Sequence, residues 1–82
     1  MIEKKIYEIL STKLKDSKVF IQDMNGNGDH FSLIVITDDF ENLNMINQHK
    51  IIYKYLSDMI TKEIHALQIK TYTWDKWKKE NQ

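Results

Sequence analysis

Apolar and polar positions along the chain follow two periodicities, and the helical one predicts two main helices. Near the N-terminus, apolar residues recur every three or four positions between charged ones, which predicts a helix over residues 2–14. A longer stripe with the same spacing predicts a second helix over residues 44–61, with Lys50 and Lys54 outside the stripe. The stripes consist of Ile2, Ile6, Ile9, Leu10 and Leu14, and of Met45, Ile46, His49, Ile52, Tyr53, Leu56, Met59 and Ile60.

Three further stretches have the composition and periodicity of β-strands. Residues 19–22 are short, β-branched and aromatic, and residues 31–37 are apolar on both faces, as expected of a central strand. Residues 64–72 alternate, which predicts a third strand that His65 opens. One of its faces holds His65, Leu67, Ile69 and Thr71, and the other holds Ala66, Gln68, Lys70 and Tyr72.

Two polar stretches have a structural and a functional interpretation. Residues 25–29 contain both glycines of the chain, which favours a hairpin turn over an anion-binding loop because a strand follows. Asp38 and Asp39 open a polar connection, where helix capping explains them better than a divalent-cation site. Residues 73–79 predict a short C-terminal helix with Thr73 as its N-cap.

The order of these elements brings two histidines together. A helix that joins the second strand to the third favours parallel pairing, so both strands begin at the same end of the sheet. His30 opens the second strand and His65 opens the third. We therefore expect an α+β domain with a three-stranded mixed sheet, in which two imidazoles project from neighbouring strand starts. The alternative is a local role for each: His65 packed over the core and His30 capping the glycine loop.

Composition limits what such a site can be. The 82 residues predict a single domain, 1–82, and contain no cysteine, so the chain can offer a metal only His, Asp and Glu. Two imidazoles suit iron, copper or zinc, but they form only half of a site, which a second molecule would complete. No nucleophile–base pair or nucleotide motif is present, which predicts a protein that is not an enzyme.

The charge composition argues weakly against nucleic-acid binding. Twelve lysines balance twelve acidic residues and arginine is absent, although arginine carries most bidentate base and phosphate recognition. No apolar run is long enough to span a membrane and no secretion signal opens the chain, so we expect a cytoplasmic protein without membrane contact.

Several segments, in order, resemble the BolA-like family, nearest its short bacterial type. They are Asp29-His30-Phe31-Ser32-Leu33-Ile34-Val35-Ile36, Phe40, Asn47-Gln48-His49-Lys50-Ile51-Ile52-Tyr53, Leu56, and Ile64-His65-Ala66-Leu67 through Thr73 to Trp77. The resemblance implies a fold related to the class II KH arrangement and a monothiol glutaredoxin as partner. It also implies a shared [2Fe-2S] cluster, with His65 and His30 as ligands and with thiolates from the glutaredoxin and glutathione.

Four residues are expected at partner surfaces. Ile64 and Ala66 flank His65 and are expected to contact the glutaredoxin. Trp74 and Trp77 would form a partner-facing aromatic patch, because exposed tryptophans are frequent interface anchors, unless they pack on the sheet. Without the partner we expect a monomer or weak homodimer. The alternative function is a DNA-binding transcriptional regulator, but the chain lacks a Gly-x-x-Gly loop and carries Phe40-Glu41-Asn42 where the family usually has Phe-x-Gly. Its phosphate contacts would be Lys50, Lys54, Lys70 and Lys76.

Overall fold

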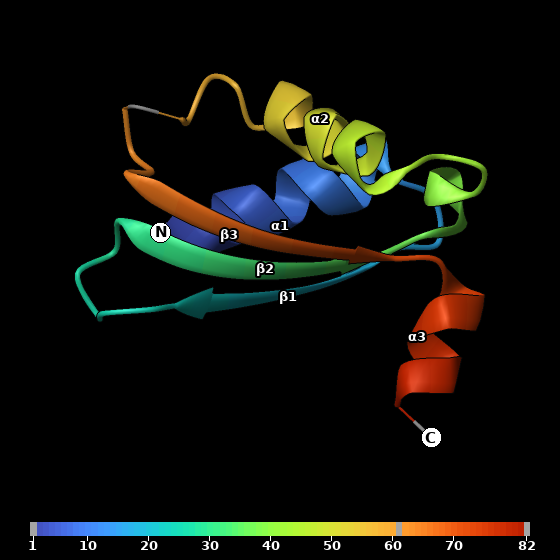
Figure 1. The fold of residues 1–82 in the computed structure, drawn as a ribbon. Helices are drawn as coiled ribbons and strands as arrows, with labels where there is room; N and C mark the ends of the chain where they lie inside the picture. The colour runs from blue at the N-terminus through green and yellow to red at the C-terminus, as the bar shows by residue number, and fades with distance from the viewer. Residues whose placement is uncertain (1, 61, 82) are drawn as a thin grey trace.

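A three-stranded mixed sheet forms the base of the domain in the computed structural model, which describes residues 2–60 and 62–81. The strands are β1 (Lys18–Asp23), β2 (His30–Ile36) and β3 (Ala66–Tyr72), and β2 lies in the centre. β1 pairs with β2 antiparallel, and β2 pairs with β3 in parallel (Figure 1). The parallel pairing confirms the topology predicted from the helical crossover.

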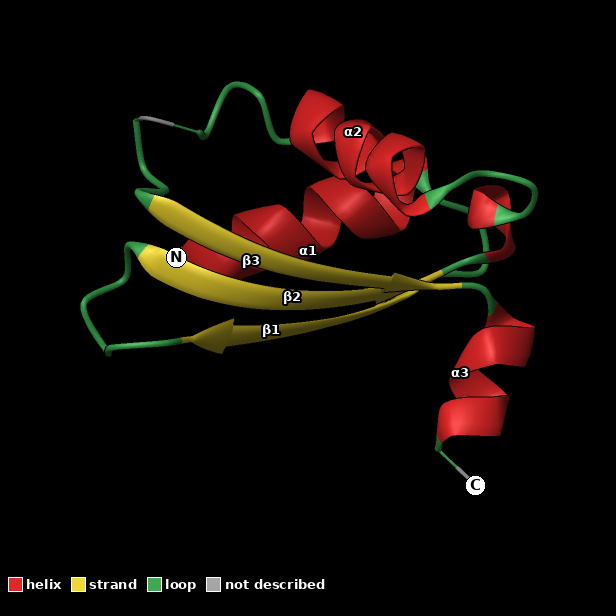
Figure 2. Ribbon diagram, in the orientation of Figure 1, coloured by secondary structure: helices red, strands yellow, loops and turns green. Residues whose placement is uncertain are grey.

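Two helices cover one face of this sheet, and a third lies beyond its opposite face. Helices α1 (Ile2–Lys13) and α2 (Met45–Tyr55) lie side by side on the same face (Figure 2). The short α3 (Trp74–Glu80) follows β3 and turns away from them, with Thr73 as its N-cap as predicted. A 3-10 helix, η1 (Asp38–Phe40), leads from β2 toward α2. The predicted α+β class is therefore confirmed.

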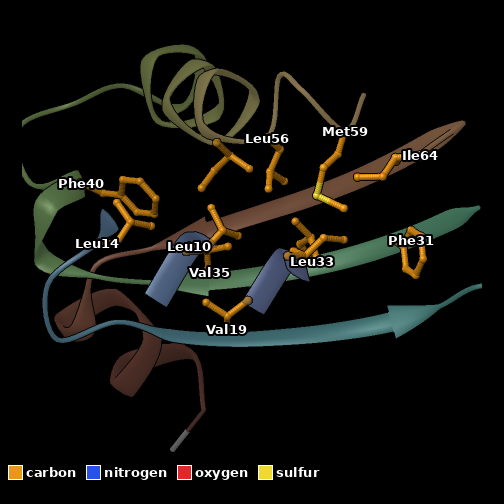
Figure 3. Packing of buried hydrophobic residues seen from close by; sticks show 12 residues of the cluster. Leu10, Leu14, Val19, Phe31, Leu33, Val35, Phe40, Leu56, Met59 and Ile64 are labelled. Carbon is orange, nitrogen blue, oxygen red and sulfur yellow. The ribbon is translucent and has the colours of Figure 1, made fainter. Parts of the chain in front are cut away.

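The core lies between the helices and the sheet (Figure 3). Phe31, Leu33 and Val35 alternate along β2 and are at most 1% exposed, because this strand is covered by α1 and α2. Loss of this apolar surface from water is the main stabilising term of the fold. The helices and their connections supply Ile6, Leu10, Leu14, Phe40, Ile52, Leu56, Met59 and Ile64.

The second helix is shorter than its apolar stripe predicts. It ends at Tyr55, and Leu56 is its C-cap, whereas the predicted helix runs to residue 61, which lies outside the described residues. Leu56 and Met59 are nevertheless buried, because the turn after α2 places them against the same core. The helical spacing of apolar residues therefore extends beyond the C-terminal end of α2.

Three apolar residues of the same stripe do not face the core. Met45 is 62% exposed, Ile46 is 67% exposed and Tyr53 is 44% exposed. The side of α2 that faces inward includes a polar residue, Gln48, whose amide nitrogen donates to the Leu43 carbonyl and whose amide oxygen accepts from the Thr71 hydroxyl. These hydrogen bonds orient the helix so that part of its apolar surface remains in solvent.

The glycine loop is the turn that was expected, whereas the aspartate pair does not cap the second helix as predicted. Gly26 and Gly28 have positive φ angles, and their N–H groups donate to the Asp23 carboxylate, which leaves neither to hold an anion. Asp38 accepts from the N–H of Trp74 and Asp39 from that of Lys15, so the pair caps segments other than α2. The N-cap of α2 is Asn44, whose side chain accepts from the N–H of Asn47.

Candidate functional site

The two predicted ligands lie at one end of the sheet, where β2 and β3 begin. His30 is opposite Ala66 in the parallel register, and His65 directly precedes β3 rather than opening it as predicted. The carbonyl of Asp29 accepts from the N–H of His65 at 2.8 Å and from that of Ala66 at 3.2 Å. The residue before His30 therefore fixes the main chain of His65.

The side chain of His65 is accessible from outside. The residue is exposed, which contradicts the alternative in which it packs over the core. It borders a small cavity of about 150 Å³ whose other walls are mainly apolar. A second molecule can therefore reach His65 and fill a hollow beside it. The cavity is lined by Tyr53, Ile60, Ile64, His65, Ala66 and Leu67.

His30 is half-buried and already has a local partner. Its Nδ1 lies 3.1 Å from Nδ2 of Asn25, in the glycine loop. The Asn25 amide is oriented by its oxygen, which accepts from the N–H of Asn27 at 3.0 Å. Asn25 thus presents a donor to Nδ1, so neutral His30 accepts there and carries its proton on Nε2. This bond gives His30 the loop-capping role that was the alternative to metal binding.

The donor chemistry at this end of the sheet fits part of a metal site. Within residues 2–60 and 62–81, no three His, Cys, Asp or Glu side chains converge, so these residues supply at most a partial ligand set. Imidazole suits iron, copper and zinc, and a ligating histidine usually donates its other N–H to a neighbouring acceptor. Oδ1 of Asp29, the residue before His30, is buried and has no hydrogen-bond partner among the described residues.

The residues predicted to contact a partner divide into exposed and buried ones. Ala66 is exposed next to His65, but Ile64 is only 3% exposed and belongs to the core. Its assignment as a surface contact is corrected for this reason: the chain turns inward at Ile64 to close the core below β3.

Both tryptophans pack within the domain. The indole N–H of Trp74 donates to the Asp16 carbonyl at 2.8 Å. Trp77 stacks on Phe20 at 5.7 Å between ring centroids and meets the edge of Tyr72 at 5.2 Å. They remain partly exposed, but these contacts give them the packing role that was the alternative to a partner-facing patch.

The four lysines proposed for phosphate contact do not form one surface. Lys70 and Lys76 line a cavity of about 290 Å³ between α2, β3 and α3, and Nζ of Lys76 lies 5.8 Å from the ring centre of Tyr72. Lys50 and Lys54 are exposed on α2 and do not line that cavity. The structure thus brings together two of the four.

Comparison with protein families decides the classification. A profile described as "BolA-like protein" matches residues 6–76. The chain belongs to the BolA-like family. An uncharacterised Haemophilus influenzae relative is 42% identical over 77 residues, which are 93% of this chain and 87% of that protein. Some matches are partial: the aligned region covers 47% of the length of an uncharacterised Buchnera aphidicola relative.

Similar proteins with names or structures agree with this membership. The structure of a BolA homologue from Coxiella burnetii has a TM-score of 0.76 and 32% identity, and the match covers 92% of this chain and 94% of that one. A Haemophilus influenzae protein named "DNA-binding transcriptional regulator BolA" is 32% identical over 57 residues, 70% of this chain and 55% of its own. The family assignment made from the sequence is thereby confirmed.

Two residues of the site escaped the sequence reasoning. Asn25 was interpreted only as a turn residue, and Asp29 only as part of the glycine loop. The position of Asp29 could have been recognised from the sequence, because it directly precedes His30 at the start of β2. In a parallel pair with β3, the carbonyl at that position accepts a hydrogen bond from β3. The loop position of Asn25 carries no such signal, because its contact with His30 depends on how the loop folds.

Proposed function

We propose that this BolA-like domain is a non-enzymatic adaptor. It binds a monothiol glutaredoxin and co-ligates a [2Fe-2S] cluster for iron-sulfur trafficking or iron sensing. The observation that carries the proposal is the exposed His65, held by the Asp29 carbonyl next to His30 in a domain of this family. The partial ligand set supports a shared site, because the missing ligands must come from the partner.

The division of ligands follows from the chemistry of each chain. This chain has no cysteine, so the thiolates would come from the glutaredoxin and from glutathione, and His65 would supply an imidazole nitrogen. When bound, the cluster supplies one-electron chemistry, and histidine ligation of one iron raises its reduction potential. In this proposal His65 is the primary ligand, since no hydrogen bond engages its ring within the described residues.

His30 is proposed as the second ligand, and the loop around it must first rearrange. Ligation through Nε2 places the remaining proton on Nδ1, which then faces the amide group of Asn25. The two N–H groups would oppose each other, so the Asn25 amide must rotate or move away. Binding of the glutaredoxin next to the loop would drive this movement of the Asn25 amide.

Reconstitution with the partner tests the proposal. Mixing this chain with a monothiol glutaredoxin, iron, sulfide and glutathione should give a heterodimer whose visible absorption and circular dichroism differ from those of the glutaredoxin homodimer. In the reduced cluster, electron-nuclear double resonance should detect a histidine nitrogen. His65→Ala should remove the coupling of its own nitrogen and leave only that of His30, whereas His49→Ala, a change at the remaining histidine, should leave both. An unchanged spectrum with His65→Ala would refute the assignment.

DNA binding is the second candidate, because a relative named as a DNA-binding regulator is 32% identical to this chain. Lys70 and Lys76, which share one cavity, would supply the phosphate contacts, with Lys50 and Lys54 at the flank. Such binding would fall with salt by about 0.9 log units per log unit of salt for each phosphate contacted. Titrations with duplex DNAs of unrelated sequence, at several salt concentrations, test this candidate function. Equal affinity for all sequences would exclude a role as a transcriptional regulator.

A further inference from the structure

Strand β3 has a free edge with unpaired backbone groups. It is the last strand of the sheet, and within the described residues no strand lies on its outer side. The N–H of Ala66 donates to the Asp29 carbonyl, and the carbonyl of Tyr72 accepts from the N–H of Thr37, so both residues face β2. Backbone groups alternate in direction along a strand. Leu67, Ile69 and Thr71 therefore direct their N–H and C=O groups outward.

The same three residues line two cavities along this edge. Leu67 borders the cavity beside His65, and Ile69 and Thr71 border the cavity that Lys70 and Lys76 share. Helix α2 supplies the opposite wall at both places, with Tyr53 at the first cavity and Met45 and His49 at the second. Figure 1 shows α2 above the later part of β3 and the connection that follows α2 above the start of the strand. We call these two cavities and the strand between them the edge groove.

Two large apolar residues that α2 contributes to the edge groove do not belong to the core. Met45 is 62% exposed and Tyr53 is 44% exposed, and neither belongs to the buried cluster. Large apolar side chains that are exposed beside unpaired strand backbone form a surface on which another strand can pack. The groove therefore offers hydrogen bonds along its floor and apolar contacts along its wall.

The charges of the groove are mostly positive. Lys70 and Lys76 line the larger cavity together with one carboxylate, that of Glu80. The excess of lysine favours an acidic occupant. It disfavours a second copy of this chain, because pairing two β3 edges would place both sets of lysines in one interface.

We propose that the edge groove binds an extended, acidic segment of a partner protein, which adds to β3 as a fourth strand. The outward groups are alternating donors and acceptors at strand spacing, and a peptide backbone matches both, whereas a phosphate backbone has no donors. Apolar side chains of the segment occupy the two cavities, and its carboxylates lie near Lys70 and Lys76. The proposal does not depend on cluster ligation, although the first cavity of the groove borders His65.

A synthetic peptide provides the test. An eight-residue peptide of alternating valine and glutamate, labelled with fluorescein, should bind the full chain. Amide hydrogen exchange followed by NMR should slow about tenfold at Leu67, Ile69 and Thr71 as these groups gain partners, in line with formation of backbone hydrogen bonds. The amides of Gln68 and Lys70 already face β2, so their exchange serves as an internal control and should change little.

Three controls separate strand addition from other binding. The same peptide with alternate backbone nitrogens methylated keeps its charge and side chains but cannot complete the ladder, and should not bind. Lys70→Glu and Lys76→Glu should each weaken binding by up to about fivefold, as expected for partly exposed ion pairs. The matched charge reversal Lys54→Glu lies outside both cavities and should have no effect.

Three results would overturn the inference. They are binding of the methylated peptide as tightly as the unmodified one, protection spread equally over odd and even residues of β3, and occupancy of the groove by a short oligothymidylate in place of the peptide. The last would assign the groove to nucleic acid. Loss of glutaredoxin binding in His65→Ala, with peptide binding retained, would show that the two surfaces fail independently.

Discussion

Gln48 joins helix α2 to strand β3, and its replacement should destabilise the whole domain. Its Nε2 donates to the Leu43 carbonyl at 2.7 Å, and its Oε1 accepts from the hydroxyl of Thr71 at 2.6 Å. Thr71 is 8% exposed, so its hydroxyl has little access to water. Gln48→Met keeps the length of the side chain but removes both of these bonds.

The expected loss can be worked out from these contacts. One lost hydrogen bond costs about 1 kcal/mol, and a buried hydroxyl left without a partner costs about 1–3 kcal/mol. Gln48→Met should therefore lower the free energy of unfolding by about 2–4 kcal/mol. For a domain of this size, each kcal/mol lowers the melting temperature by about 4–8 °C, so a fall of roughly 10–30 °C is expected.

A double-mutant cycle measured by urea unfolding tests the physical reason. Thr71→Val removes the hydroxyl, so adding Gln48→Met to it leaves no buried donor unsatisfied. The double variant should be more stable than the sum of the single losses by about 1–2 kcal/mol, with an unchanged dependence on urea. If the two losses add to within about 0.5 kcal/mol, the residues are not coupled and the reasoning is refuted.

Three further predictions concern the loop and the C-terminal helix. Asp23→Ala should remove acceptors for two glycine N–H groups, cost about 1.5 kcal/mol, and speed amide exchange in the loop without altering β3. In Asn25→Asp the new carboxylate should accept a hydrogen bond from Nδ1–H of His30 and so favour metal ligation through Nε2. Cobalt or zinc titrations followed by NMR should then show tighter binding at His30, and a His30 chemical shift that does not respond to the metal would contradict this prediction. Trp77→Ala should cost about 1–3 kcal/mol through its two aromatic contacts, while Trp77→Phe should retain most of the stability in thermal melts.

Periodicity predicted the architecture because the strongest patterns arise from burial. The run from Phe31 to Ile36 is central in the sheet, and the crossover through α2 makes β2 and β3 parallel, as the element order required. The pattern failed at α2 for a physical reason. Gln48 turns inward to satisfy Thr71 and the Leu43 carbonyl, so the helix is rotated away from the orientation that its apolar stripe alone would select.

The candidate site could be predicted only as far as topology reaches. The shared sheet end of His30 and His65 follows from parallel pairing, and the structure places them there. The hydrogen bond between Asn25 and His30 depends on the shape of an irregular loop, and the burial of Ile64 depends on a turn that the alternating pattern concealed. Contacts of both kinds are set by tertiary packing, which local sequence does not encode.

Strand β3 connects the two proposed surfaces because its two edges and its N-terminal end have different surroundings. Its inner edge is fixed by β2, the start of the strand leaves His65 exposed, and its outer edge has no strand partner in the part of the chain that the structure describes. The cavity beside His65 is also the first cavity of the edge groove. A partner segment that extends along β3 therefore ends next to the proposed ligand. Any effect of this segment on the affinity for the glutaredoxin must be matched by an equal effect of the glutaredoxin on the affinity for the segment.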